Sequence, residues 1–99
     1  MPRKINITPR ARADLYNIWE YTVENWSEKQ ANKYISSIHD RLNNLSETPF
    51  IGKQRKDIAS GYYSFPCLEH LIFYLIQEDS IDIIGVPHQQ MDILHYFDD

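Results

Sequence analysis

The chain has 99 residues, of which 42% are hydrophobic and 24% charged, and this balance is typical of one globular domain spanning residues 1–99. Its single cysteine, Cys67, excludes an internal disulfide framework. Neither a long apolar run nor a charged leader with an apolar core is present to indicate membrane insertion or export. We therefore expect a cytoplasmic protein that folds without covalent cross-links.

The formal net charge of -4 hides an uneven distribution along the chain. All 10 Lys and Arg residues lie in residues 1–56, whereas residues 57–99 contain acidic residues and no Lys or Arg. A phosphate backbone held by the second half would need cations there, and that half offers only histidine, which is mostly neutral at pH 7. The charge pattern therefore argues against nucleic-acid binding through the C-terminal half.

The first half of the chain predicts a strand followed by two helices. Alternation in "KINIT", residues 4–8, is typical of a short half-buried strand, and Thr8 and Pro9 suit the start of a helix. A capping box from Ser27 to Gln30 ends this helix and begins a second, which continues to about residue 46. The two helices should form an antiparallel hairpin. The apolar stripe of the first helix consists of Ala11, Leu15, Ile18, Trp19, Thr22, Val23 and Trp26.

The second half predicts a loop and then an antiparallel sheet. Residues 46–57, "SETPFIGKQRKD", contain Pro, Gly and several charges, which favours a connection without regular structure. Three extended segments follow at residues 62–66, 69–77 and 81–86, and the last two are joined by a turn at residues 78–80. The order is β-α-α-β-β-β. We expect an α+β fold in which the helical hairpin packs on one face of a small, mainly antiparallel sheet.

Residues 61–92, "GYYSFPCLEHLIFYLIQEDSIDIIGVPHQQMD", resemble the C-terminal half of ParE-type toxins of the RelE/ParE superfamily. The phrases "EHLIFY" at 69–74 and "HQQMD" at 88–92 carry the resemblance, and "TPFIGKQRKDI" at 48–58 supports it. The resemblance implies the toxin of a type II toxin–antitoxin system, which traps DNA gyrase in its cleavage complex with DNA, through the A subunit, and is neutralised by a ParD-like antitoxin. RelE-like cousins instead cleave messenger RNA on the ribosome.

Two residues depart from the family pattern. Pro87 stands where relatives usually have an aliphatic residue, and Gln90 stands in place of an arginine. Because proline has no backbone N–H, we expect Pro87 to end strand pairing or to face an unpaired side. The missing arginine would remove a fixed cation from any target contact at position 90.

The charged residues of the predicted sheet give little support for catalysis. Cleavage through the 2′-hydroxyl needs a proton acceptor, a donor to the leaving oxygen and positive groups near the phosphate. The predicted sheet of residues 62–86 carries Glu69, Glu78, Asp79 and Asp82 without Lys or Arg, although Lys4 on the first strand, or Lys53, Arg55 and Lys56 in the loop, could reach a site. We predict a toxin without catalytic residues. A RelE-like ribosome-dependent endoribonuclease and a toxin of reduced potency are the alternatives.

None of the four histidines is interpreted as catalytic: a structural role is favoured for His88, packing for His70 and exposure to solvent for His39. His88 precedes Asp92 by four residues, so the two could act as base and orienting carboxylate, but a hydrogen bond that fixes a turn is favoured. His70 belongs to an apolar strand, His39 to the second helix and His95 to the tail. This spacing predicts no metal site, and no cofactor is expected.

Two sets of residues are the candidate binding sites. The target set lies at the last strand end and in the tail, residues 91–99, and consists of His88, Gln90, Met91, Asp92, Leu94, Tyr96 and Phe97. Its apolar and aromatic members would act as anchors, unless the tail folds back on the sheet. An antitoxin would lay a helix on the hairpin and add a strand at a sheet edge. Its candidate contacts are Leu15, Trp19, Trp26, Tyr34 and Tyr74, although core packing is the default for the tryptophans.

Overall fold

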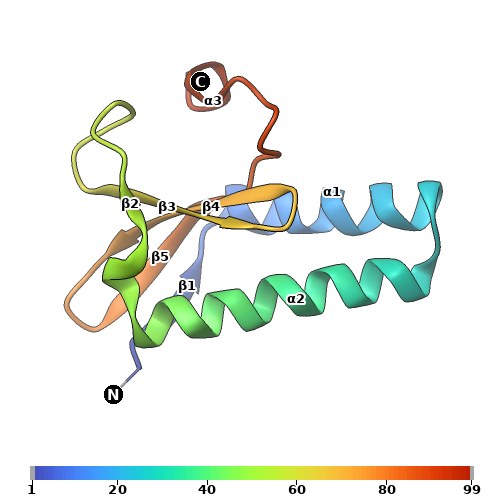
Figure 1. Cartoon of the computed structure of the whole chain (residues 1–99), viewed down its shortest axis with the longest axis horizontal. Coiled ribbons are helices and arrows are strands. Elements are labelled where there is room, and N and C mark those ends of the chain that lie inside the picture. The colour runs from blue at the N-terminus through green and yellow to red at the C-terminus, as the bar shows by residue number, and fades with distance from the viewer. Residues whose placement is uncertain (1, 99) are drawn as a thin grey trace.

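A computed structural model describes residues 2–98, and two helices and a five-stranded sheet form its main layers (Figure 1). The elements are β1 (Lys4–Ile7), α1 (Pro9–Asn25), α2 (Glu28–Glu47), the 3-10 turn η1 (Pro49–Ile51), β2 (Lys53–Gln54), β3 (Tyr62–Cys67), β4 (His70–Ile76), β5 (Ser80–Gly85) and α3 (Ile93–Tyr96). The predicted α+β fold is confirmed. In the described part of the chain, none of the helices combines the length and the apolar character needed to cross a membrane.

Local capping positions the helical hairpin. The Thr8 side chain accepts a hydrogen bond from the Ala11 amide at 3.2 Å and donates one to the Ile83 carbonyl at 2.8 Å, so the N-cap also ties α1 to β5. Ser27 accepts from the Gln30 amide at 3.0 Å and starts α2. Both predicted helix starts are therefore confirmed, and the N-cap of α2 follows the C-cap of α1 directly.

The strand order in the sheet is β1-β5-β4-β3-β2. Strand β1 runs parallel to β5, with Lys4 opposite Ser80 and Ile7 opposite Ile83, and the other neighbouring pairs are antiparallel. A register shift interrupts the β4–β5 pairing between Phe73 and Tyr74. The first strand and the last strand are thus neighbours, which brings the start of α1 close to the chain that leaves β5.

One local expectation is wrong, and a second is confirmed in part. The segment 46–57 is not free of regular structure, because it contains η1 and the short edge strand β2, where Lys53 pairs with Ser64. Strand β5 ends at Gly85, before Pro87, as expected, but an isolated bridge between His70 and His88 follows. There the Leu71 amide donates to the Pro87 carbonyl at 2.9 Å, and the Gln89 amide donates to the Glu69 carbonyl at 2.8 Å. Proline lacks only the donor, so its carbonyl still accepts a bond from the neighbouring strand.

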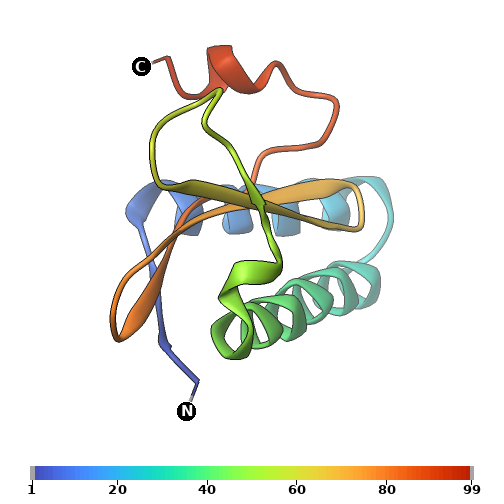
Figure 2. The same cartoon turned by 60° about the vertical axis from the view of Figure 1, so that its left-hand side comes forward.

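Each face of the sheet has its own cover. Helices α1 and α2 bury the main core, where Ile38 and Leu42 pack with Ile72 and Tyr74. Phe73 points to the opposite face and is also 0% exposed, because its ring lies 5.0 Å from that of Phe97 in the tail. Figures 1 and 2 show α2 on one side of the sheet and α3 on the other.

Truncating Phe73 tests whether this second face belongs to the folded unit. We expect Phe73→Ala to lower the free energy of unfolding by about 3–5 kcal/mol, because the side chain is fully buried. Urea denaturation measures the change. Ile72→Ala, on the helix-covered face, is the matched variant, with an expected loss of about 2–5 kcal/mol. A loss below about 1 kcal/mol for Phe73→Ala alone would show that the tail contributes no stable cover.

Candidate partner-binding groove and C-terminal tail

A groove of about 570 Å³ lies between the helical hairpin and the adjoining ends of β4 and β5. From α1 it is lined by Asp14, Ile18, Tyr21 and other residues, and Trp26 follows at the helix end. Tyr34 of α2, the β4 and β5 ends and two tail residues, Met91 and Tyr96, complete its wall. Aromatic rings and carboxylates thus share one concave surface. We call it the hairpin groove, because both helices of the hairpin line it.

Two histidines meet in the hairpin groove, and both have hydrogen-bond partners. The Tyr34 hydroxyl lies 2.7 Å from His70 Nδ1 and accepts a hydrogen bond from the Glu69 amide at 3.2 Å. Burial lowers the pKa of His70 to about 4, so its ring is neutral near pH 7. Because the Tyr34 oxygen already accepts from the Glu69 amide, its hydroxyl hydrogen is placed to donate to Nδ1. The two histidine rings lie 5.1 Å apart. His88 Nδ1 accepts from the Gln90 amide at 3.1 Å, which leaves Nε2 facing Glu69 Oε2 at 3.9 Å.

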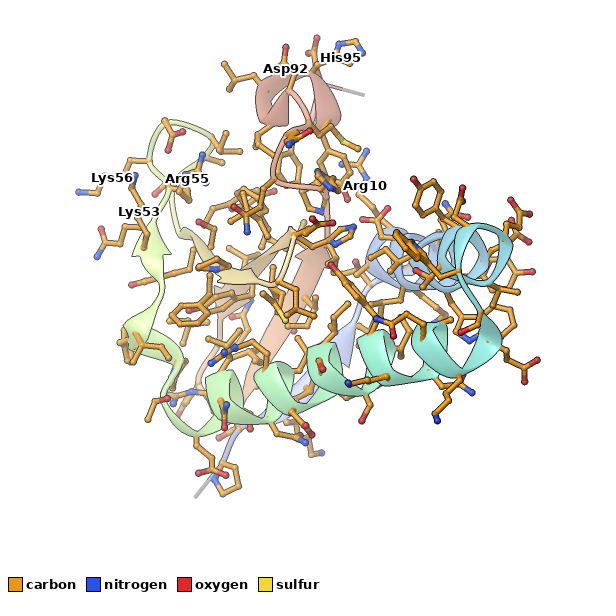
Figure 3. All side chains as sticks on the ribbon, turned by 45° about the vertical axis from the view of Figure 1, so that its right-hand side comes forward. Arg10, Lys53, Arg55, Lys56, Asp92 and His95 are labelled. Atoms are coloured by element: carbon orange, nitrogen blue, oxygen red, sulfur yellow. The ribbon has the colours of Figure 1, made fainter. Side chains whose placement is uncertain are left out.

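Positive charge is absent from the described lining of the hairpin groove, which includes no Lys or Arg. Lys53 of β2 and Lys56 of the loop after it extend outward, and Asp92 and His95 lie on the outer side of α3 (Figure 3). Arg55 is committed to a structural role: its guanidinium pairs with Asp57 at 3.0 Å and lies 5.1 Å above the Phe73 ring. This hydrogen bond from Arg55 also lowers the pKa of Asp57.

The tail folds back on the second face of the sheet, the alternative to a free binding tail. Asp92 caps α3 by accepting a hydrogen bond from the His95 amide at 3.2 Å. The Tyr96 hydroxyl donates to the Asp14 carboxylate, and burial is the main cause that raises the pKa of Tyr96. The Phe97 ring lies 5.6 Å from that of Tyr62.

This packing corrects the picture of Tyr96 and Phe97 as free anchors. Both are half-buried. They cover the apolar surface around Phe73, which would face water without them. Met91 and Leu94 remain 46% and 63% exposed, and Asp92 and Gln90 are exposed as well. His88 stands apart from the outer tail, in the wall of the hairpin groove.

Only part of the predicted antitoxin set lies on one surface. Trp26 is 75% exposed, and it shares the hairpin groove with Tyr34. Leu15 packs against the core, and Trp19 bridges the two helices through a hydrogen bond of 2.9 Å to Asn32. Tyr74 is 0% exposed and donates to the Pro49 carbonyl at 2.6 Å, so it is not accessible to a partner. Alternation alone could not show that both faces of β4 are covered.

Asp14 and Tyr21 are groove residues that the sequence reasoning missed. They lie outside the apolar stripe of α1, but Asp14, Ile18 and Tyr21 fall at the 3- and 4-residue spacing that places side chains on one side of a helix. This second stripe of α1, which mixes polar and aromatic residues, is therefore the sequence pattern that could have identified Asp14 and Tyr21.

Solved structures define the class of fold. The chain is similar to a chain of the chromosomal ParDE toxin–antitoxin system from P. aeruginosa, with a TM-score of 0.76 and 18% identity over 87% of this chain and 95% of that one. It is also similar to a chain of the toxin–antitoxin complex RelBE2 from Mycobacterium tuberculosis, with a TM-score of 0.70 and 19% identity over 90% and 100% of the two chains. The chain thus shares its fold with both of these toxin–antitoxin chains.

Sequence relatives narrow the class to one family. The chain is 31% identical to Toxin ParE1 of Mycobacterium tuberculosis, over 94% of this chain and 96% of the relative. It is 30% identical to Toxin ParE1 of Caulobacter vibrioides, over 87% and 88% of the two chains. The family model for the ParE toxin of type II toxin–antitoxin systems, parDE, matches residues 5–93. The chain belongs to this ParE toxin family.

Acidification tests the environment of His70. Because its pKa is lowered from 6.5 to about 4, the unfolded chain takes up this proton first as the pH falls. The contribution of His70 to stability is present above pH 6.5 and is lost between pH 6.5 and 4. We expect a loss of about 1–3 kcal/mol, allowing for the partial exposure of the ring.

The measurement compares urea denaturation of the wild type and His70→Asn at pH 7 and pH 4.5. Asparagine retains an acceptor for Tyr34 but does not titrate, so the variant should lose less stability on acidification than the wild type. His39→Asn, on the exposed surface of α2, is the control. Equal pH dependence of wild type and His70→Asn would contradict the buried, neutral ring.

Proposed function

We propose that this ParE-family toxin acts by binding DNA gyrase and trapping the gyrase–DNA cleavage complex, without cutting RNA itself. The observation that carries the proposal is the charge of the hairpin groove, where His70 and His88 meet beside Glu69 and Asp14, with no Lys or Arg in the described lining. A histidine pair in a concave surface is the arrangement that would suggest acid–base chemistry. The carboxylates around this histidine pair favour a role in binding a partner instead.

Electrostatics oppose a phosphate at this position. A negative charge about 4 Å from a carboxylate is disfavoured by about 4 kcal/mol at an effective dielectric constant of 20. RNA cleavage adds charge to the phosphate in the transition state, and each stabilising donor that is missing raises the barrier by about 3–4 kcal/mol. His70 is neutral, since burial lowers its pKa to about 4, and its Nδ1 already accepts from Tyr34. The groove therefore supports binding of a protein partner better than scission of RNA.

The outer side of the tail is the surface that we assign to gyrase. Leu94 is an exposed apolar side chain on it, Met91 is exposed at its boundary with the hairpin groove, and Asp92 and Gln90 lie close to them in the chain. Exposed apolar residues surrounded by polar ones are typical of the centre and rim of a protein interface. Tyr96 and Phe97 hold the tail on the sheet through Asp14 and Phe73 and leave this side of the tail facing outward.

Parallel assays with purified components separate the two activities. We expect the toxin to inhibit DNA supercoiling by gyrase and to increase the amount of protein-linked cleaved DNA, while messenger RNA in a reconstituted translation reaction keeps intact ends. The RelE-like alternative predicts the reverse pattern. Cleaved message together with unaffected gyrase would therefore contradict the proposal.

The hairpin groove is the site that we assign to a ParD-like antitoxin. It is lined by aromatic side chains of both helices, including Tyr21, Trp26 and Tyr34, and apolar grooves of this kind accept an amphipathic helix. Tyr21 and Trp26 are 64% and 75% exposed, and exposed aromatic side chains that share a groove are typical of binding sites. Glu69 and Asp14 favour basic residues at the edge of the bound segment.

Replacing Trp26 tests this assignment. We expect Trp26→Ala to weaken antitoxin binding at least about 10-fold, because exposed tryptophans in grooves are frequent binding hot spots. Tyr16→Ala is the matched control, since Tyr16 is a 59% exposed aromatic residue of α1 that does not line the groove. Isothermal titration calorimetry with the purified antitoxin gives both affinities. Equal affinity of Trp26→Ala and wild type would place the antitoxin on another surface.

A further inference from the structure

Asp14 joins three segments that are distant in the sequence. Its Oδ2 atom accepts a hydrogen bond from the Val86 amide at 2.9 Å and a second from the Tyr96 hydroxyl. Asp14 belongs to α1, Val86 directly follows β5, and Tyr96 is the last residue of α3. One carboxylate on the first helix thereby fixes the position of the C-terminal helix.

Gly85 leaves room for this contact. A Cβ atom at position 85 would lie 2.2 Å from the Tyr96 hydroxyl oxygen and 3.1 Å from ring atom Cε2. Any side chain at this buried position would therefore push the Tyr96 ring away from Asp14. The close approach of the ring to the backbone explains why glycine occupies the end of β5.

Arg10 supports the same tail residues from the preceding turn of α1. Its guanidinium carbon lies 4.8 Å from the centre of the Tyr96 ring and 5.7 Å from that of the Phe97 ring. Residues 10 and 14 are four positions apart, so their side chains project from the same side of the helix. Helix α1 thus contacts the tail in two ways. The Arg10 guanidinium lies over two aromatic rings, and the Asp14 carboxylate accepts a hydrogen bond from the Tyr96 hydroxyl.

The tail needs such an anchor to keep one conformation. Helix α3 has only four residues, and a helix of that length is not stable in isolation. Asp14 adds no apolar side chain to the buried hydrophobic core. Its two hydrogen bonds act instead at the junction of α1 with the chain that leaves β5.

We propose that Asp14 is a positioning residue for target engagement, which holds α3 on the sheet through Tyr96 so that Leu94 and its neighbours meet the target in one orientation. This inference rests on the proposed function, because it takes the outer side of the tail as the target-binding surface. A preordered surface loses less conformational entropy on binding than a mobile one, and loss of the anchor therefore weakens binding without removing any contact residue.

Three variants test the anchor from different sides. Asp14→Asn removes the charge of the acceptor, Tyr96→Phe removes the donor, and Gly85→Ala displaces the ring without altering either partner. Tyr16→Phe is the matched control, because it also removes a hydroxyl that bonds a carboxylate, in this case Glu20 at 3.2 Å on the exposed surface of α1. Circular dichroism confirms folding. If Asp14→Asn does not fold, Tyr96→Phe and Gly85→Ala address the same contact.

Two readouts are taken for each variant. Hydrogen exchange of the amides of residues 93–97 should become at least about 10-fold faster, while the amides of β4 keep their protection. The concentration of toxin that half-inhibits gyrase supercoiling should rise about 10-fold. The double variant Asp14→Asn/Tyr96→Phe should be no weaker than the more affected single variant, since both changes remove one contact. The Tyr16→Phe control should match the wild type in both readouts.

The outcomes distinguish this inference from the proposed function. Faster tail exchange with unchanged gyrase inhibition would overturn the positioning role and leave gyrase binding intact. Unchanged tail exchange in Tyr96→Phe and Gly85→Ala would overturn the anchor itself. Failure of the wild-type toxin to inhibit gyrase would overturn the proposed function, and the target-directed role of Asp14 with it. Fully additive effects in the double variant would also contradict a shared contact.

Discussion

The fold depends on one constraint, the burial of β4 on both of its faces. Ile72, Phe73 and Tyr74 are consecutive and all 0% exposed, although successive side chains of a strand point to opposite faces. Two helices supply the cover for Ile72 and Tyr74, and the chain beyond β5 supplies the cover for Phe73. The hydrophobic effect therefore draws the C-terminal tail onto the sheet and places Leu94 on the outside.

This arrangement separates the two proposed contact surfaces while keeping them adjacent. The hairpin groove lies between the helices and the sheet, and the outer side of the tail faces solvent. Asp14 and Tyr96 belong to the boundary, since both line the groove and bond to each other. Cations such as Arg55 serve the packing of the second face and do not line the described groove. Both features are consistent with the partner-binding toxin that we propose.

Local signals made the fold predictable, and long-range contacts limited the prediction of the site. Thr8 and Ser27 mark helix starts because an N-cap acts within three residues. Strand β2 escaped prediction because its two residues are ordered by pairing with β3. The bond between Tyr96 and Asp14 spans 82 positions, and the choice of face for Tyr74 depends on the register of the whole sheet. Neither follows from a local pattern.

The central claim is that the toxin acts through the outward surface of its docked tail on gyrase. Site-specific photo-crosslinking from position 94 tests it most directly, because Leu94 is 63% exposed and tolerates a probe without loss of the core. In a cell extract that contains gyrase, DNA and ribosomes, the account predicts a crosslink from position 94 to a gyrase subunit, and none from a control probe at His39 on α2. A crosslink from position 94 to ribosomal components alone would contradict it.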